Sequence, residues 1–483
     1  MMTASKTAFA SLGLLCGLGF LITACPASLD DRCADGACAA SGDAAPGQDA
    51  VIVVDGGSDA TTDPCIDKPT DPACLDENKT LFVSAPNGVD ASATGTQAKP
   101  FKTIGAALGK ITAAKRRIYI CDGTYAEDIK LDATHSGVSL FGGIDCSWKA
   151  APASKPVIGA SANPFKIDGT TGLAIADIAI EAKDATKGSS IAVFVNGGDA
   201  TFSRARLVAG MGFKGDDAVL VPFTYPDVAA LKGKDASGNS GGVATPYTCP
   251  GGAITTGGKG GDVGGSGASG TPGTANPGTL SNCTSDVTGH AGTQPAASSG
   301  ATTLGLLADT GWAPQAGTPG PNGTPGQGGG GGYGNGGAGG GGGAGGCGGA
   351  GGPGGKGGGA SIALAANTAR VTLTASELKA KDAGPGGGGG IGQTGQPDFG
   401  TGGNRSGAAC NGGNGGIGGD GAPGGGGAGG VSIGVLYKGT KPTIDPTTEQ
   451  QIALGTKGTA GAAAPGFTNV GTDGKSAATL EAN

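Results

Sequence analysis

The sequence has few aromatic residues, few charged residues and almost no histidine. Aromatic residues make up 4% and charged residues 14% of the 483 residues, and the only histidines are His135 and His290. This composition is far from that of an ordinary enzyme domain and closer to that of a low-complexity or fibrous protein. There is no Cys-x-x-Cys, and no Gly-x-Ser-x-Gly elbow, phosphate-cradling loop or zinc-ligand set occurs in convincing context, so we expect no catalytic residue, no metal site and no cofactor.

Charge is sparse and unevenly distributed. The formal net charge is -7 and the basic residues are scattered, which excludes the electrostatic footprint of a nucleic-acid-binding protein. Acidic residues concentrate near the N-terminus, at Asp30, Asp31, Asp35, Asp43, Asp49, Asp55, Asp59, Asp63, Asp67 and Asp71. This spacing indicates a solvated linker.

Glycine, by contrast, supplies 107 of the 483 residues, and much of it has a period of three. From Gly336 the chain reads Gly-Gly-x eight times in succession, and Gly412–Gly430 keeps glycine at every third position. A left-handed helix of three residues per turn has this period, and glycine faces let neighbouring helices bond through their backbones. Proline is too sparse for collagen. Two interpretations stay open, a bundle of polyglycine-II-like helices and disordered tracts, because glycine loses much entropy on ordering and buries no apolar side chain.

Three segments between the glycine tracts resemble one another. They begin Ser-Ile at Ser190, Ser361 and Ser432, and eleven positions later each has a threonine, at Thr201, Thr372 and Thr443. Leu207 matches Leu378, and the third copy needs about three extra residues to bring Ile452 to this place. A strand-turn-strand unit cannot bury its own apolar face, so we expect the copies to stack into a solenoid. The predicted inward-facing side chains include Ile175, Ile191, Val193 and Val195.

The segment from Leu81 to Trp148 carries an ordered series of strand, helix and turn patterns. A strand begins at Leu81, and Ile104, Ala107, Leu108 and Ile111 have helical spacing. A strand over 117–120, a Gly-Thr-Tyr at 123–125 and a Gly-Gly turn at 142–143 follow. The series resembles the opening of pectin-lyase-like right-handed parallel β-helix proteins of uncharacterised function. That resemblance implies an all-β, single-stranded solenoid whose first coil is capped by a short helix.

The N-terminus resembles a bacterial lipoprotein leader. Lys6 precedes an apolar run from Ala8 to Ile22 that is too short and too glycine-rich for a stable membrane-spanning helix, and the run closes at Ile22-Thr23-Ala24-Cys25. The resemblance implies that Cys25 is lipidated and anchors the chain to a membrane; ordinary secretory cleavage is the alternative. Pro26 offers no acidic inner-membrane retention signal, so we expect the outer membrane.

The other cysteines agree with export to an oxidising compartment. Without Cys16 and Cys25, ten of the twelve remain. Pairing in order of sequence predicts disulfides Cys33–Cys38, Cys65–Cys74, Cys121–Cys146, Cys249–Cys283 and Cys347–Cys410, although order alone does not fix the connectivity.

Several polar residues are candidates for calcium binding or catalysis. The segments Gly257–Asp262 and Gly415–Asp420 partly match the calcium-binding nonapeptide repeat. Neither repeats in tandem, and neither has the large apolar eighth residue of that motif. The charged pairs Asp177 with Glu181, Glu377 with Lys379 and Arg204 with Arg206 fit the solvated side of alternating strands better than a catalytic groove. His135 stands alone in a turn and is interpreted as a surface residue.

The resulting prediction is an exported surface lipoprotein without catalytic activity. Its parts would be a signal peptide (1–24), a disulfide-looped linker (25–78), β-helix coils (79–215, 358–386 and 431–483) and glycine-rich insertions (216–357 and 387–430). The insertions resemble, in composition, the glycine-rich PE-PGRS-type surface proteins of mycobacteria. We expect a structural, adhesive or carbohydrate- and matrix-binding role with some self-association. The alternative is a polysaccharide lyase or glycoside hydrolase, which would need a groove with several acidic residues and an Arg or Lys.

Overall fold

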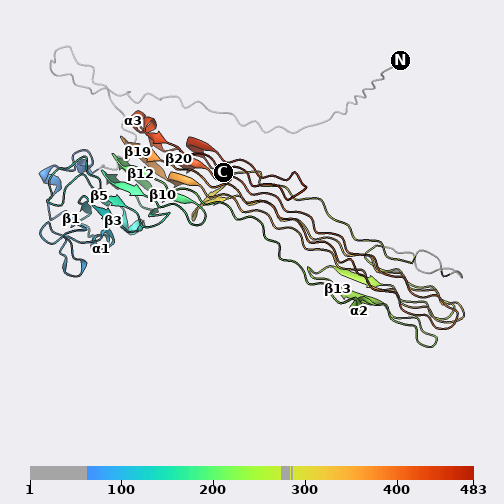
Figure 1. The fold of residues 1–483 in the computed structure, drawn as a ribbon. Helices are drawn as coiled ribbons and strands as arrows, with labels where there is room; N and C mark the ends of the chain where they lie inside the picture. The colour runs from blue at the N-terminus through green and yellow to red at the C-terminus, as the bar shows by residue number, and fades with distance from the viewer. Residues whose placement is uncertain (1–62, 274–282, 284–286, 483) are drawn as a thin grey trace, which may run out of the picture. The chain divides into compact units, whose positions relative to one another are not determined.

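Parallel β-sheets dominate the computed structural model, which describes residues 63–273, 283 and 287–482 (Figure 1). The leader, Cys25 and the Cys33–Cys38 pair lie outside these residues. From β2 onward the chain passes repeatedly through three sheets in the order A, B, C, and every neighbouring pair of strands in them is parallel. We call these three sheets the coil stack. The prediction of an all-β fold with parallel sheets is confirmed.

The strands of each sheet follow sequence order. Sheet A contains β1 (Thr80–Val83), β2 (Arg117–Ile120), β5 (Ser139–Phe141), β8 (Leu173–Ala176), β11 (Asp199–Ser203), β18 (Arg370–Thr374) and β21 (Thr443–Ile444). Sheet B contains β3 (Thr124–Tyr125), β6 (Val157–Ile158), β9 (Ala179–Glu181), β12 (Arg206–Val208), β19 (Glu377–Lys379) and β22 (Ile452–Ala453). Sheet C contains β4 (Ile129–Leu131), β7 (Phe165–Asp168), β10 (Ser190–Asn196), β17 (Ser361–Asn367), β20 (Ser432–Lys438) and β23 (Ser476–Glu481).

The three Ser-Ile segments are neighbouring strands in the predicted register. Ser190 pairs with Ser361, and Ser361 pairs with Ser432. The threonines at 201, 372 and 443 align in sheet A, and Leu207, Leu378 and Ile452 align in sheet B. Strand β23 then adds a further copy beginning at Ser476, which the sequence comparison missed because small residues replace the apolar ones there.

One of the predicted inward positions is wrong. Val193 and Val195 lie in the main core with Ile175, whereas Ile191 belongs to a second cluster on the other face of sheet C. The ladder between β10 and β17 skips Ala192, and the side-chain alternation reverses there. Strict alternation therefore fails at this bend, although Ile191 is still buried.

The serine that begins each copy accepts a hydrogen bond from the backbone near the end of a sheet B strand. The buried hydroxyl of Ser190 accepts a hydrogen bond of 2.8 Å from Gly210 N–H, and Ser361 accepts one of 2.8 Å from Lys381 N–H. Ser432 does the same for Gly455 N–H at 3.0 Å. Each donor lies where the chain leaves sheet B.

We expect Ser361→Ala to lower the free energy of unfolding by about 1–2 kcal/mol, because Lys381 N–H loses its acceptor in a buried place. Urea denaturation of the two proteins measures this effect. Ser476→Ala is the control, since Ser476 is exposed; an equal loss at both positions would contradict the role assigned to Ser361.

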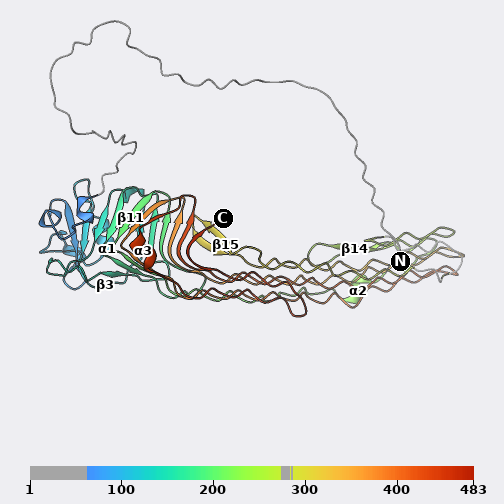
Figure 2. The ribbon, with the colours of Figure 1, turned by 90° about the horizontal axis from the view of Figure 1, so that it is seen from above.

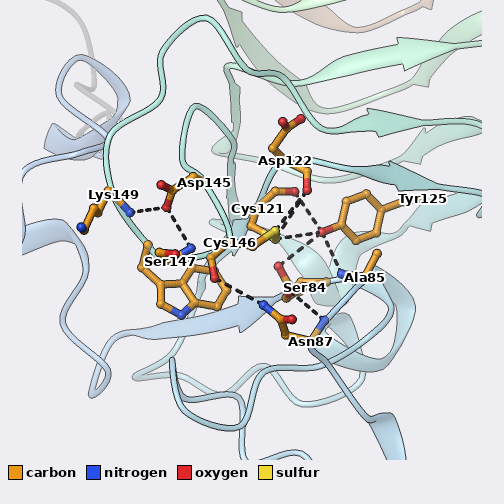
Figure 3. Close-up of a disulfide and its surroundings, with 12 residues drawn as sticks. Ser84, Ala85, Asn87, Cys121, Asp122, Tyr125, Asp145, Cys146, Ser147 and Lys149 are labelled. Carbon is orange, nitrogen blue, oxygen red and sulfur yellow. Dashed lines mark hydrogen bonds between the residues drawn. A yellow bond between two sulfur atoms is a disulfide. The ribbon is translucent and has the colours of Figure 1, made fainter.

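Helix α1 (Ile104–Leu108) covers the first coil, as the resemblance implied. Its residues Ile104, Ala107 and Leu108 are buried in the main core, and Ile111 packs against that core from beyond the end of the helix. Beside the first coil the Cys121–Cys146 disulfide forms as predicted (Figure 3). The Tyr125 hydroxyl donates to Cys121 O at 3.0 Å, and burial raises the pKa of Tyr125 to about 12.

The glycine excursions all leave from one corner of the coil stack. They connect β12 to β17, β19 to β20 and β22 to β23, so each starts in sheet B and returns to sheet C. Their described parts, within residues 209–360, 380–431 and 454–475, run side by side (Figures 1 and 2). We call them the glycine bundle. The third excursion was missed, since its glycines do not form a tract.

Backbone hydrogen bonds join the bundle at every third residue. Gly340, Gly343 and Gly346 donate to the carbonyls of residues 410, 413 and 416, so these two segments run parallel. Gly323, Gly326 and Gly329 donate to residues 349, 346 and 343, so that pair is antiparallel. These hydrogen bonds agree with the ordered bundle, not with disordered tracts, for the described glycine residues.

Consecutive residues in a segment bond to different neighbours. Gly342 donates to Gly258 at 2.8 Å, Gly343 to Gly413 at 3.0 Å and Ala344 to Leu231 at 2.8 Å. In a helix with three residues per turn, three consecutive residues face three different directions, so each would bond to a different neighbouring segment. Segments approach so closely that a Cβ on Gly342 would lie 1.9 Å from Gly329 O. The residues between glycine pairs, such as Ala338 and Ala344, are also buried.

Two of the predicted disulfides are wrong. The structure pairs Cys249 with Cys347 and Cys283 with Cys410, not Cys249 with Cys283 or Cys347 with Cys410. The bundle places segments far apart in sequence side by side, so order in the chain does not decide which cysteines meet. Cys65–Cys74 and Cys121–Cys146 are confirmed. These disulfides indicate an oxidising, exported environment.

Aspartates fasten the edges of the glycine bundle. Asp262 accepts a hydrogen bond of 2.9 Å from Gly241 N–H, and Asp235 accepts one of 2.7 Å from Asn404 N–H. Asp382 accepts one of 2.7 Å from Thr456 N–H. In all three, the backbone hydrogen bond lowers the pKa of the carboxyl group below its usual value.

These lowered pKa values predict an acid-sensitive bundle. These carboxyl groups bind protons less readily in the folded chain than in the unfolded chain. Their contribution to the free energy of unfolding is therefore fully present above about pH 4 and is lost as the pH falls through their folded-state pKa values. We expect Tm to decrease when the pH is lowered below about 4. The decrease should be smaller in the triple variant Asp235→Asn/Asp262→Asn/Asp382→Asn. An identical acid profile for the two proteins in calorimetry would count against these contacts.

Short elements complete the excursions. Helix α2 (Val228–Leu231) and the hairpin of β13 (Thr245–Thr248) and β14 (Ile254–Gly257) belong to the first excursion. A second hairpin, of β15 (Gly305–Ala308) and β16 (Gly311–Pro314), follows in the same excursion. Helix α3 (Pro446–Gln450) supplies the extra residues of the third Ser-Ile copy.

Candidate functional site

A pocket lies where the disulfide-looped segment meets sheet A. Its volume is 350 Å³. It is lined by Asp67, Lys68, Pro69, Thr70, Asp71, Gly143, Pro152, Asp177 and Arg204. One wall comes from residues 67–71, and the opposite wall comes from corners of the coil stack.

Two residues at these corners, Asp177 and Arg204, have an unusual backbone conformation. Asp177 lies between β8 and β9 with φ of 58°, and Arg204 lies between β11 and β12, one coil further on, with φ of 51°. Their backbones are joined because Asp177 N–H donates to Ser203 O at 3.0 Å. Ala375 has φ of 47° at the corresponding corner between β18 and β19, so this left-handed conformation recurs along the coil stack and does not by itself mark a functional site.

The Asp177 carboxylate is buried and fully engaged. Its side chain is 4% exposed, and Arg204 binds it through two nitrogens, Nε to Oδ1 at 3.0 Å and Nη2 to Oδ2 at 2.8 Å. Lys155 Nζ lies 3.7 Å from Oδ1 and donates to Arg204 O at 2.6 Å. A bidentate guanidinium fixes the position of the carboxylate and occupies the lone pairs that a general base would use.

The segment 63–75 is attached to sheet A, although the sequence suggested a solvated linker. Arg117 Nε binds Asp63 Oδ2 at 2.7 Å, and Arg204 Nη2 donates to Ile66 O at 2.7 Å. Burial works to raise the pKa of Asp63, but the hydrogen bonds from Arg117 and Cys65 N–H outweigh it and the pKa is lowered. Residues Cys65, Ile66 and Cys74 pack against Phe82, Tyr119 and Phe141.

No protein-family model matches the chain, and no curated protein or solved structure matches it significantly.

The interpretation as the solvated side of a strand is wrong for Asp177, which is buried after the end of β8 and paired with Arg204. Glu181 binds Arg206 and does not line the pocket that holds Asp177 and Arg204. Glu377 and Lys379 both point to solvent on β19, as expected for the outer side of a strand. His135 caps a turn by bonding Asp132 at 2.9 Å.

The aspartates of the two near-nonapeptide segments are also occupied. Asp262 binds Gly241 N–H at 2.9 Å, and Asp420 accepts a hydrogen bond of 2.8 Å from Gly395 N–H. Within residues 63–273, 283 and 287–482, no group of three acidic, histidine or cysteine side chains is placed to hold a metal ion. The described helices are all too short or too polar to cross a membrane.

The sequence did not indicate that Asp67 and Asp71 line this pocket, since both were assigned to the linker. It also gave no sign that Lys155 lies beside Asp177. Nothing in the sequence shows that a loop held by a disulfide over nine residues returns to a corner more than one hundred residues away.

Proposed function

We propose that the protein is an exported, lipid-anchored surface protein that displays the glycine bundle from a right-handed parallel β-helix and has no catalytic activity. Its role is structural or adhesive, with carbohydrate or other envelope material as the binding partner. The observation that carries the proposal is that three excursions from one corner of adjacent coils join into a single hydrogen-bonded bundle.

The bundle is proposed to consist of helices of the polyglycine-II type. Bonding at every third residue to different neighbours on successive faces supports this assignment. Glycine-rich outer segments present backbone N–H and C=O groups, which favour association with a second copy or with other hydrogen-bonding polymers. Cys25 supplies the lipid anchor, with the outer membrane as the site.

Two experiments test this proposal. Mass spectrometry of the mature N-terminus is expected to find diacylglycerol on Cys25; an unmodified N-terminus, or one at another residue, would remove the anchor. A glycan array with the oxidised full chain is expected to show binding without cleavage. The adhesive role would be contradicted if the protein bound no glycan, no envelope material and no second copy of itself.

The second candidate function is cleavage of an acidic polysaccharide at the 350 Å³ pocket. It is favoured by the gathering of Asp67, Asp71 and Asp177 with Arg204 around one space. The two functions differ in one assay. If the pocket is catalytic, polyuronates incubated with the protein yield new reducing ends or unsaturated uronates, and Asp177→Asn abolishes them. We expect no such product.

A further inference from the structure

A groove lies on the outer face of sheet C, beside the turn of the β15–β16 hairpin. Its volume is 200 Å³, and Ile191 and Phe194 of β10 contribute apolar side chains to its lining. Thr310 and Gly311 of the hairpin turn form one wall. A Cβ on Gly311 would lie 3.8 Å from Ile191 Cδ1, so the turn lies directly against the apolar lining. We call this space the sheet C groove.

Two lysines line the sheet C groove from neighbouring strands. Lys130 of β4 pairs in register with Lys166 of β7, and Lys166 pairs with Phe194. Lys166 Nζ lies 5.7 Å from the centre of the Phe194 ring, so its ammonium group is held over the apolar lining. Like charges directly opposite on neighbouring strands are destabilising. An acidic group between the two lysines would therefore stabilise this part of the sheet.

The lysines are available to bind such a group. Lys130 has no ion-pair or hydrogen-bond partner among the described residues, and the carboxylate near Lys166 is that of the exposed Asp168, at 3.4 Å. Asp128 is the one acidic residue among those that line the groove, so the lining carries a net positive charge. The groove thus combines an apolar floor with a positive rim, which fits an apolar segment that carries a carboxylate.

The acidic linker contains a segment of this kind. It reads Asp49-Ala50-Val51-Ile52-Val53-Val54-Asp55, and it lies outside the described residues. The four residues from Val51 to Val54 are the only valines and isoleucines of residues 25–62, and β-branched residues of this type favour an extended chain. An aspartate closes the segment at each end, so its charge is complementary to that of the groove.

The linker enters the described structure close to the sheet C groove. Its first described residue, Asp63, binds Arg117 and accepts a hydrogen bond of 3.1 Å from Ser139 Oγ. Strand β4 ends one residue after Lys130, and β5 begins at Ser139, so Asp63 is held beside the corner between these two strands. Asp55 is eight positions before Asp63, and an extended chain of that length spans at most about 26–29 Å. Lys130 is therefore within reach of Asp55.

We propose that residues 49–55 of the linker dock in the sheet C groove of the same chain. In an extended segment, Val53 and Asp55 point to the same side, about 6.6 Å apart. The midpoint between the two lysines lies about 7 Å from Phe194 along the sheet, since neighbouring strands are about 4.8 Å apart. Asp55 therefore binds between the lysines while Val53 packs on the apolar floor.

Docking attaches more of the linker to the coil stack than the segment 63–75 alone. If Cys25 carries the lipid proposed above, residues 25–48 rather than 25–62 separate the membrane from the coil stack. The docking itself does not depend on the anchor, so a chain without lipid tests it equally well.

Zero-length cross-linking with a carbodiimide tests the contact, because it joins a carboxylate to an amine only where the two meet. In the oxidised full chain we expect mass spectrometry to find Asp55 joined to Lys130 or Lys166 of the same chain. Lys379, exposed on β19, is the control and should not react with Asp55. Links between two chains, detected by mixing isotope-labelled and unlabelled protein, would assign the groove to a second copy and overturn the proposal. No link to either groove lysine would overturn it too, and would leave the groove to an acidic partner outside this chain.

Hydrogen exchange with reversed charges tests the same contact without a reagent. In Lys130→Glu/Lys166→Glu we expect the amides of residues 49–55 to exchange about tenfold faster, because attraction becomes repulsion. Lys130 is exposed and Lys166 half-buried, so Tm should not change. Adding Asp55→Lys to this variant is expected to restore the slower exchange, whereas Asp59→Lys, the matched control, is not. Exchange that does not respond to the lysine variant, or that both aspartate variants restore equally, would contradict the docking.

Discussion

Gly389→Ala is expected to destabilise the glycine bundle by about 3 kcal/mol, whereas Gly388→Ala is expected to be neutral or slightly stabilising. A Cβ on Gly389 would lie 2.2 Å from Gly424 O and 2.8 Å from Gly425 C. Both are backbone atoms of a neighbouring segment, so no side chain can move aside. Separation of the segments would break hydrogen bonds of the network as well.

The matched control is the adjacent glycine. A Cβ on Gly388 would meet nothing closer than 3.7 Å, and both glycines are partly exposed. Hydrogen exchange is the appropriate measurement, because the amide of Gly427, which donates to Gly387 O at 2.9 Å, reports on this part of the bundle directly. Equal protection in the two variants would mean that the segments are not packed as described.

Loss of the Cys249–Cys347 disulfide is expected to cost about 5 kcal/mol, and loss of Cys65–Cys74 about half as much. The bonds close loops with sequence separations of 98 and 9, and a longer loop restricts the unfolded chain more strongly. Denaturation of Cys249→Ser/Cys347→Ser and Cys65→Ser/Cys74→Ser variants gives the two values.

The same disulfides provide a test of connectivity. Peptide mapping without reduction is expected to recover Cys249 with Cys347 and Cys283 with Cys410. Recovery of Cys249 with Cys283 would place the first excursion's cysteines in a local loop and would contradict the arrangement of segments in the bundle.

The sequence predicted the coil stack well because apolar periodicity and a repeated register are local signals. The alignment of Ser190, Ser361 and Ser432 followed from spacing alone, and so did a helix beginning near Ile104, whereas its capping position was implied by the family resemblance. Ile191 was placed on the wrong face because the bend at Ala192 leaves no mark in an alternating pattern.

The glycine bundle and the pockets could be predicted only in part. The period of three indicated which helix the tracts could form, but the choice of neighbours depends on long-range contacts such as Gly343 with Gly413. The same holds for the side chains that meet across the fold. Arg204 reaches Ile66, and Trp312 lies in one cluster with Ile433, although each pair is far apart in sequence.

Segments far apart in the sequence are adjacent coils, and the glycine-rich stretches are excursions between them. Spin labels at Thr201→Cys and Thr372→Cys probe this arrangement, because these residues pair in sheet A across the longest excursion. Continuous-wave EPR of the doubly labelled protein should show strong dipolar broadening, since neighbouring strands lie about 4.8 Å apart. Spectra equal to the sum of the two singly labelled proteins would show that the segments are not neighbours, and the account would be wrong.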